Sequence, residues 1–296
     1  REVEARLAEG FHAVKLRVHA ATLEEDLAQI RETRRAVGEA AVLSVDANQG
    51  WRVAAVADAP RWDFERARAF CEEAARLGFA WVEEPLPMDD EEGLARLSPS
   101  VSVPIAGGEL DGRGVRGFGR MLERGCLSIY QPDAVFSGGI AESWAIARRV
   151  RGAGRAFSPH TWTNGIGFGI NLQVYAACAD REKTLLEYPI DPPGWVPEAR
   201  DGLLERPWTH ERGEIAVPSA PGLGLDIDLR ALSRYGTRIS VWTRFRVAVS
   251  ALWEKGWGAA REMGATREAR LVRRAVELDR AVAAGKDPVR ETLESL

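Results

Sequence analysis

Short apolar segments alternate with longer amphipathic segments from the first residue to about residue 237. Seven of the apolar segments have the length of a strand: 13–18, 41–47, 79–85, 103–109, 127–134, 155–160 and 184–189. The stretches between them have helical period, for example 23–37 and 64–78, and residues 1–10 predict a helix that ends at Gly10. Strands that alternate with amphipathic helices indicate βα units and a parallel sheet.

Seven βα units fall one short of a (β/α)8 barrel, which takes about 250 residues. We therefore expect an α/β fold of the (β/α)8, TIM-barrel type, with the first strand absent from this sequence. A doubly wound open sheet is the alternative. Its Gly-rich phosphate loop does not follow the first apolar segment, so the barrel is favoured.

A polar or charged residue lies at the end of every predicted strand. In chain order these residues are Lys15 with Arg17, Asp46, Glu83, Glu109, Asp133, His160 and Glu187. Successive positions, counted from Lys15, are 24 to 37 residues apart, which is about one βα unit each. The carboxyl ends of the strands in a parallel barrel meet at one face, where active sites are built. We therefore expect these side chains to converge.

Three of the converging residues are carboxylates on neighbouring strands, namely Asp46, Glu83 and Glu109. Like charges so close would oppose one another's ionisation, and a divalent cation removes that conflict. An all-oxygen site with open positions suits Mg²⁺ or Mn²⁺. Glu84, the neighbour of Glu83, is expected on the opposite face of its strand, paired with an arginine behind the barrel.

Asp133 and His160 form a second predicted group. A carboxylate holds an imidazole in one tautomer and raises its pKa, which suits a general base or acid near neutral pH. The other three histidines do not share this spacing, and we interpret them as structural or surface residues. Lys15 is one of only four lysines in the chain, which draws attention to its place within a predicted strand.

Seven sequence blocks, in order and at matching spacing, carry a resemblance to a known family. The blocks are VKLR (14–17), VDANQGW (45–51), WVEEPL (81–86), PIAGGE (104–109), QPDAVFSGGI (131–140), SPH (158–160) and LLEYP (185–189). They resemble the signature blocks of the enolase superfamily, mandelate racemase subgroup, from about Gly10 to Asp228. The resemblance implies a Mg²⁺-dependent enzyme that abstracts the proton alpha to a carboxylate through an enediolate intermediate.

The resemblance also implies a role for each matched position. The family's metal ligands are matched by Asp46, Glu83 and Glu109. Asn48 would support the metal or the substrate carboxylate, and Asp133 with His160 would form the catalytic dyad. Glu187 matches the acid that hydrogen-bonds a carboxylate oxygen of the substrate.

The second strand of the family usually carries Lys-x-Lys, whereas this sequence reads Lys15-Leu16-Arg17. Arginine is a poor proton acceptor, and a racemase needs a base on each face of the α-carbon. We therefore expect a lyase that dehydrates a sugar acid, with Lys15 and Arg17 holding the enediolate. A racemase or epimerase of a 2-hydroxy acid or an amino-acid derivative is one alternative. An inactive barrel fragment that acts in assembly is another.

The N-terminal α+β capping domain of the family has no match in this sequence. We expect a small carboxylate substrate and a homo-oligomer, or a partner chain that supplies the capping domain.

The chain carries 40 Lys+Arg against 44 Asp+Glu, a balance that rules out nucleic-acid binding by bulk charge and gives no attraction to anionic membranes. Its three cysteines are far apart and indicate neither disulfides nor zinc. No apolar run reaches the ~18 residues of a membrane span and no signal peptide is evident, so we expect a cytoplasmic protein.

The charge is uneven along the chain. Residues 238–296 carry 12 basic and 8 acidic residues, whereas residues 1–237 carry 28 and 36. We therefore predict a barrel domain over 1–237 and a basic helical extension over 238–296. The apolar positions of the extension share one helical face. We expect it to pack on the barrel or on a second subunit, with a membrane-surface helix as the alternative.

Overall fold

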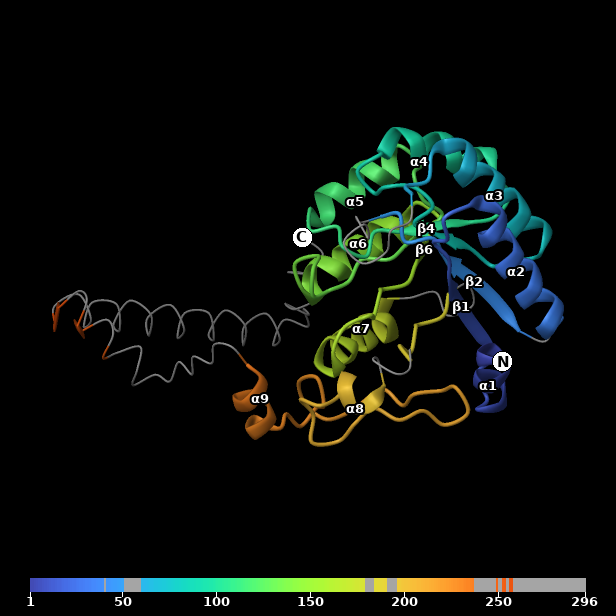
Figure 1. Cartoon of the computed structure of the whole chain (residues 1–296). Coiled ribbons are helices and arrows are strands. Elements are labelled where there is room, and N and C mark those ends of the chain that lie inside the picture. The colour runs from blue at the N-terminus through green and yellow to red at the C-terminus, as the bar shows by residue number, and fades with distance from the viewer. Residues whose placement is uncertain are drawn as a thin grey trace. The chain divides into compact units, whose positions relative to one another are not determined.

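The computed structural model describes residues 1–39, 41–50, 60–178, 184–190 and 196–236, together with 249, 252–253 and 256–257. The chain divides into two compact units, Arg1–Asp228 and Leu229–Leu296. The first unit carries the sheet and every predicted site residue (Figure 1). In the second unit the described helix is α9 (Leu229–Tyr235).

The described sheet has six strands, and they follow one another in chain order, all parallel. The strands are β1 (Ala13–Arg17), β2 (Val42–Asp46), β3 (Val82–Glu83), β4 (Ile105–Gly107), β5 (Ile129–Tyr130) and β6 (Ala156–Phe157). Their register aligns the strand ends, since Arg17 pairs with Asp46 and Asp46 with Glu83. The carboxyl ends therefore lie side by side, which confirms the predicted parallel α/β sheet.

The seventh predicted strand, 184–189, does not form a strand, and that prediction was wrong. Its carbonyl groups accept hydrogen bonds from side chains that follow β6. The hydroxyl groups of Ser158 and Thr161 donate to the carbonyl oxygens of Leu185 and Glu187, each at 2.9 Å. The segment therefore lies beside the end of β6 without sharing a backbone ladder with it.

The missing ladder has a cause in the sequence, namely Pro159. The backbone N–H groups of Ser158 and His160 donate toward β5, to the carbonyls of Tyr130 and Pro132. Because donors alternate along a strand, the N–H of the residue between them would face the segment 184–189. Proline has no N–H to donate, so the ladder lacks a bond at this point.

The helices of the first unit confirm the predicted alternation. They are α1 (Glu2–Ala8), α2 (Leu23–Val37), α3 (Phe64–Arg76), α4 (Glu91–Leu97), the 3₁₀ turn η2 (Ser98–Ser100), α5 (Gly114–Glu123), α6 (Ile140–Gly152), α7 (Gly165–Cys178) and α8 (Pro197–Arg200). A capping box starts α2, in which Thr22 and Glu25 bond each other's backbone N–H groups. Gly10 has a φ of +97°, which favours glycine over other residues and lets the chain leave α1 for β1.

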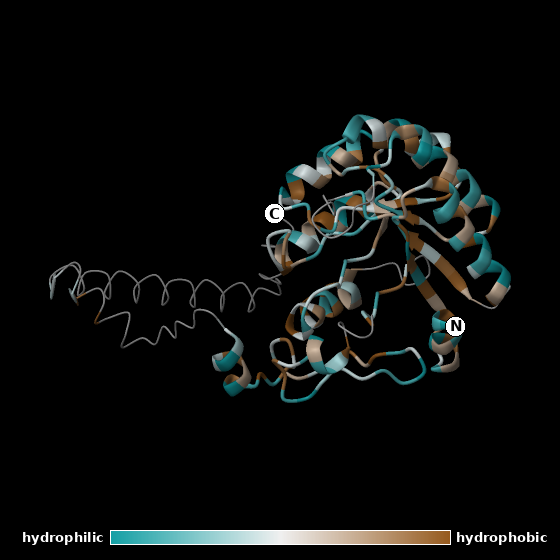
Figure 2. Cartoon of the chain, in the orientation of Figure 1, coloured by the Kyte–Doolittle hydropathy of each residue, from teal (hydrophilic) through white to brown (hydrophobic). Residues whose placement is uncertain are grey.

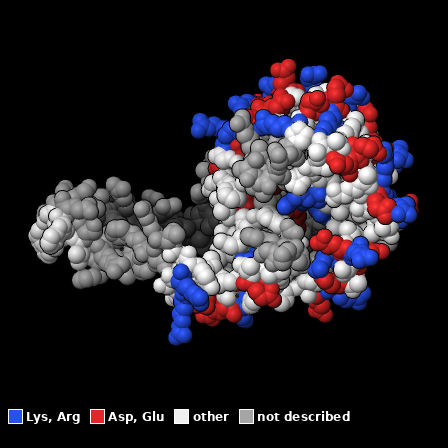
Figure 3. All heavy atoms as spheres, viewed as in Figure 1, with Lys and Arg blue, Asp and Glu red and all other residues white. Residues whose placement is uncertain are grey.

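Helices α2 to α6 follow one another around the outer side of the sheet (Figure 1). Their inward residues, such as Ile30 and Phe70, are fully buried with Leu43 and Val45 of β2 in one core cluster. Figure 2 shows the same division, with hydrophobic strands and hydrophilic outer helix surfaces. Basic and acidic side chains intermingle on the visible surface in Figure 3, with pairs such as Arg68–Glu65 one helical turn apart. The amphipathic pattern of the sequence thus becomes a core side and a solvent side.

A smaller apolar cluster forms around α7. It contains the buried residues Phe168, Leu172, Leu204 and Trp208. Next to it lies the ion pair of Arg200 and Asp201, each only 1% exposed. Arg200 also donates to the carbonyl of Pro189 at 2.8 Å and to the hydroxyl of Tyr188 at 2.9 Å. This arginine therefore fixes the segment 184–190 against α8.

Replacing this buried arginine should destabilise the first unit strongly. We expect Arg200→Met to lower the free energy of unfolding by about 3–5 kcal/mol, because Asp201 would stay buried without its partner charge. Urea unfolding followed by circular dichroism measures the change. The double variant Arg200→Met/Asp201→Asn should recover part of the loss, whereas a cost below about 1 kcal/mol for the single variant would contradict the buried pair.

The predicted helical extension lies almost wholly outside the described residues. The boundary predicted near residue 237 stays a prediction, while the two compact units divide after Asp228. Within the described part of the chain, no helix is both long and apolar enough to cross a membrane.

Candidate functional site

Three carboxylates meet at the carboxyl ends of β2, β3 and β4. Asp46 ends β2, Glu83 ends β3, and Glu109 lies two residues after β4. All three are buried, and each offers an oxygen atom within 4.8 Å of the others. The structure therefore brings together the three predicted metal ligands.

The pKa values of these carboxyl groups reflect their crowding. Burial, together with the charge of Glu83, raises the pKa of Asp46 well above its ordinary value. Burial also raises the pKa of Glu109. Burial acts in the same direction on Glu83, but the charge and hydrogen bonds of Lys15 outweigh it and lower the pKa of that group. Buried carboxylates that oppose one another's ionisation suit a hard divalent cation, which would compensate their charge.

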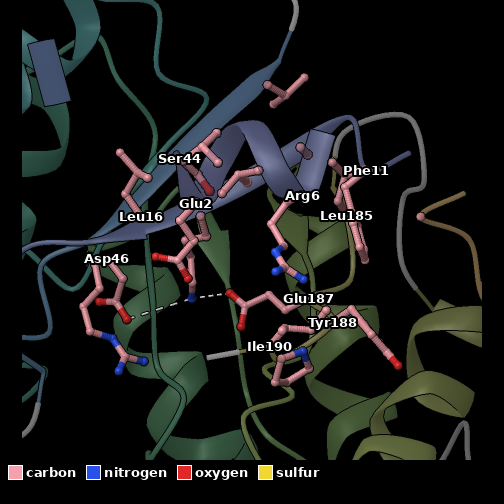
Figure 4. Close-up of a pocket in the computed structure, with 18 of the residues that line it drawn as sticks. Glu2, Arg6, Phe11, Leu16, Ser44, Asp46, Leu185, Glu187, Tyr188 and Ile190 are labelled. Carbon is pink, nitrogen blue, oxygen red and sulfur yellow. Dashed lines mark ion pairs between the residues drawn. The ribbon is translucent and has the colours of Figure 1, made fainter. Parts of the chain in front are cut away.

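Lys15 enters the same cluster from β1. Its Nζ atom donates to both oxygen atoms of Glu83 at 2.8 Å and lies 3.9 Å from Asp46 Oδ2. The same Nζ atom contacts Glu187, and Figure 4 marks the ion pairs that reach Asp46 and Glu187. Burial lowers the pKa of Lys15, but the surrounding carboxylates raise it further, so that it lies well above its ordinary value. Lys15 is therefore a fixed positive charge at the centre of the site.

Asn48 supports Asp46 directly. Its backbone N–H donates to Asp46 Oδ1 at 2.8 Å, and its side-chain Nδ2 donates to Oδ2 at 2.7 Å. Asn48 has a φ of +49°, a conformation that asparagine tolerates better than most residues. Its buried Oδ1 atom has no hydrogen-bond partner within the described residues. A buried acceptor without a partner is unusual in folded proteins and is consistent with a role toward a ligand.

Asp133 and His160 lie together, as predicted. His160 Nδ1 is 3.0 Å from Asp133 Oδ2, and His160 Nε2 is 3.1 Å from Glu109 Oε2. Burial lowers the pKa of His160, but the hydrogen bond to Asp133 and the charge of Glu109 outweigh it and raise the pKa to about 9. The imidazole thus connects the dyad with the carboxylate cluster.

Arg17 lies at the end of β1 but does not join the described ion pairs of the cluster. Its side chain is exposed, and its guanidinium carbon lies 4.9 Å from the ring centroid of Trp162. That distance is within the range of a cation–π contact. The structure therefore places Arg17 at the edge of the site rather than among the carboxylates.

The prediction for Glu84 was wrong. Strand β3 ends at Glu83, and Glu84 has a φ of +46°, so the alternation of faces along a strand no longer applies to it. Its side chain is buried, and its Oε2 atom has no hydrogen-bond partner within the described residues. Burial and the charges of the neighbouring carboxylates raise its pKa well above the ordinary value. Glu84 is therefore a fourth carboxyl group that interacts electrostatically with Asp46, Glu83 and Glu109, and within the described residues it forms no ion pair.

Two residues beside the site were not predicted. Gln131 Nε2 donates to Glu83 Oε2 at 3.0 Å, and Trp81 Nε1 lies 3.4 Å from the same oxygen. Each precedes a predicted site residue by two positions, which is the period of side chains on one face of a strand. That period was the signal in the sequence that could have identified both.

A cavity of about 440 Å³ opens between β1 and the segment 184–190. Lys15, Asp46 and Glu187 line its polar end, and Figure 4 shows Asp46 and Glu187 facing each other across it. Its remaining lining includes Arg6, Phe11, Leu185 and Tyr188. A cavity of this size, lined by both apolar and charged side chains, suits a small ligand.

Comparison with known proteins relates the chain to one family. Residues 1–231 match the family model described as enolase C-terminal domain-like. The chain is 32% identical over 238 residues to the D-galactarolactone cycloisomerase of Agrobacterium fabrum, covering 79% of this chain and 59% of that protein. It is 29% identical over 224 residues to the arabinonate dehydratase of Saccharolobus solfataricus, covering 74% of this chain and 53% of that protein. The chain thus spans between half and three-fifths of these two relatives.

A solved structure shows the same relationship. The L-talarate dehydratase from Polaromonas sp. JS666, complexed with Mg and L-glucarate, superposes with a TM-score of 0.66. It is 28% identical in sequence, and the match covers 81% of this chain and 60% of that chain. The relatives of the chain include sugar-acid dehydratases, cycloisomerases and an epimerase, all of them enzymes.

Proposed function

Because the chain belongs to the enolase C-terminal domain-like family, we propose that it takes part in a Mg²⁺-dependent reaction at the carbon next to a carboxylate. The most specific form of this proposal is the dehydration of a sugar acid to a 2-keto acid. One observation carries it: the buried Asp46–Glu83–Glu109 cluster lies within hydrogen-bond distance of the His160–Asp133 dyad through Glu109.

The three carboxylates would hold the cation. When bound, a divalent cation supplies a Lewis acid that stabilises negative charge on the carboxylate of the substrate. Lys15 adds a fixed positive charge beside the three carboxylates, because its Nζ atom contacts Glu83 as well as Glu187. Negative charge that develops on the substrate as its α-proton leaves would thus meet compensating charge within the site.

His160 would move the proton. In the proposed dehydration, the neutral form of the imidazole removes the α-proton, the bond between C3 and its hydroxyl oxygen breaks, and the departing hydroxide takes up that proton from His160 and leaves as water. The resulting enol tautomerises to the 2-keto acid. Asp133 holds the imidazole through Nδ1, so Nε2 is the atom available for proton transfer.

Strand β1, which carries Lys15 and Arg17, supports elimination over racemisation. A racemase needs a proton acceptor on each face of the α-carbon, and arginine, the residue type at position 17, is a poor proton acceptor. Lys15 forms ion pairs with Glu83 and Glu187. His160 is therefore the group best placed for proton transfer, and a single such group suffices for dehydration.

The proposal is tested by incubating the whole chain with aldonic and aldaric acids. With Mg²⁺ or Mn²⁺ present, we expect one or more acids to yield a 2-keto product, detected by mass spectrometry. The same reaction with excess EDTA should give none. Turnover that persists in EDTA, or no product with any acid, would contradict the proposed reaction.

An epimerase or racemase is the second candidate, favoured by similarity to the L-Ala-D/L-Glu epimerase of Bacillus subtilis, 26% identical over 227 residues. Deuterium exchange distinguishes the two reactions. Exchange of the α-proton from both enantiomers, without loss of water, would support 1,1-proton transfer. Exchange from one enantiomer together with keto product would support dehydration.

A further inference from the structure

One buried residue outside the predicted site bonds directly to the dyad. Asn171 lies within α7 and is fully buried. Its side-chain Nδ2 donates to Asp133 Oδ1 at 2.8 Å, and its Oδ1 accepts from the backbone N–H of Ala134 at 2.9 Å. The same Nδ2 also donates to the carbonyl of Gly167 at 3.2 Å. The amide thus donates to Asp133 and to its own helix, and accepts from the residue that follows Asp133.

The two oxygen atoms of the Asp133 carboxylate accept hydrogen bonds from different partners. Oδ1 accepts from two donors, Asn171 Nδ2 and the backbone N–H of Val135, both at 2.8 Å. Oδ2 is left to face His160 Nδ1 at 3.0 Å. A carboxyl group that accepts two hydrogen bonds on one oxygen is held as an acceptor, so the hydrogen of the third bond belongs to His160 Nδ1.

The fixed hydrogen on Nδ1 has a consequence for the other ring nitrogen. His160 Nε2 lies 3.1 Å from Glu109 Oε2, on the side of the carboxylate cluster. A rotation of the Asp133 carboxylate would release Nδ1 and let the imidazole turn away from that cluster. The bond from α7 opposes this rotation, since Asp133 is completely buried and a donor lost by its carboxylate would leave a buried acceptor unsatisfied.

We propose that Asn171 is a positioning residue, which orients Asp133 so that His160 presents Nε2 to the substrate. The proposal rests on the proposed function, since it assigns proton transfer to His160. It adds a fourth group to the arrangement Glu109–His160–Asp133 and places that group on a helix rather than at a strand end. Groups that orient a reacting residue in this manner affect rate more than substrate binding.

Two variants and one matched control test the role. Asn171→Leu keeps the size of the side chain and removes its three hydrogen bonds, while Asn171→Ala removes them without filling the space. Leu172→Ala is the control: Leu172 is the next residue of α7, 4% exposed, and packs on Phe168, Leu204 and Trp208. The control weakens helix packing without removing a hydrogen bond to the dyad.

The first measurement needs no substrate. In the unaltered chain, we expect the His160 Nδ1–H to give a slowly exchanging, downfield proton resonance in NMR, because it is buried and bonded to a carboxylate. That resonance should disappear in both Asn171 variants and persist in Leu172→Ala. A resonance that persists in both Asn171 variants would overturn the proposal, as would its equal loss in Leu172→Ala, since the effect would then belong to helix packing.

The second measurement uses an acid that the chain turns over. We expect kcat to fall about 10–100-fold in Asn171→Leu with KM changed less than about threefold, and neither to fall comparably in Leu172→Ala. An unchanged kcat, or a loss confined to KM, would overturn the role of Asn171. If the unaltered chain turns over no acid, the proposed function fails, and the NMR comparison by itself decides whether Asn171 orients the dyad.

Discussion

Asp46→Asn is expected to abolish the stabilisation of the chain by Mg²⁺ while leaving the cation-free fold as stable as before, or more stable. Without a cation, Asp46 is buried among like charges, and its pKa lies well above the ordinary value because of burial and Glu83. An amide of the same size keeps the acceptor for the backbone N–H of Asn48 and removes one charge from the cluster. It also weakens the oxygen set that a divalent cation prefers.

The size of the stabilisation by Mg²⁺ that Asp46→Asn should abolish follows from mass action. At a Mg²⁺ concentration of about 100 times the dissociation constant, a ligand that binds only the folded state stabilises it by about 2.7 kcal/mol. For a domain of this size, that corresponds to a rise in Tm of about 5–10 °C. Thermal unfolding followed by circular dichroism, in EDTA and in increasing MgCl₂, should show this rise in the unaltered chain and not in Asp46→Asn.

Asp26→Asn is the matched control for this substitution. Asp26 is also a completely buried aspartate, but it pairs with Arg66 at 2.6 Å and accepts from the backbone N–H of Ala20, away from the cluster. We expect Asp26→Asn to lower Tm equally with and without Mg²⁺, so that the rise in Tm caused by Mg²⁺ is unchanged. A Mg²⁺ increment that survives in Asp46→Asn would refute the assignment of the metal ligands.

His160→Asn should lower kcat for the proposed reaction by about 10²–10⁴-fold, the usual contribution of a positioned proton-transfer group. Asparagine has nearly the same polar character but no titrating nitrogen. The three carboxylates remain, so Mg²⁺ should still raise Tm. Steady-state kinetics on the acid found to react, and exchange of its α-proton in D₂O, would both report the loss.

His210→Asn serves as the control histidine. His210 packs against Phe11 with ring centroids 4.4 Å apart and an interplanar angle of 47°, and it lies outside the proposed catalytic groups. Its replacement should leave kcat within about threefold of the unaltered chain. Retention of α-proton exchange at the full rate in His160→Asn would contradict the role of the imidazole.

The strand ends could be predicted from the sequence because a parallel sheet imposes a simple rule. One βα unit separates each pair of successive site residues. Because neighbouring strands are in register, as Asp46 is with Glu83, residues at this spacing meet in a single cluster. Glu187 does not follow this rule, because its segment is not a strand; it lies near Lys15 because the hydroxyl group of Thr161 holds the segment beside the end of β6. Periodicity was sufficient to predict the other residues because their side chains lie at or just after the ends of regular strands.

Other features of the site could not be predicted, because they lie where the periodic pattern of the strands ends. Glu84 was assigned to the wrong face because β3 ends at Glu83, two residues before the end of the predicted segment 79–85, and a positive φ at Glu84 reorients the chain there. The segment 184–189 has the composition of a strand, but Pro159 removes a donor that its ladder would need. Asn171 lies on a helix, where no spacing rule relates it to strand ends. Single dihedral angles and tertiary hydrogen bonds of this kind are not encoded in the hydrophobic pattern.

The origin of the three carboxylates in successive strands has a consequence for the folding of the chain. Residues 46, 83 and 109 delimit two loops of the polypeptide, which contain α3 and α4. A cation held by all three carboxylates can bind only after both loops have closed, so its binding free energy offsets the entropy of closing them. With such a cation bound, the local unfolding of α3 and α4 would be coupled to the cation concentration, and the site would act as a reversible cross-link between three consecutive parts of the fold.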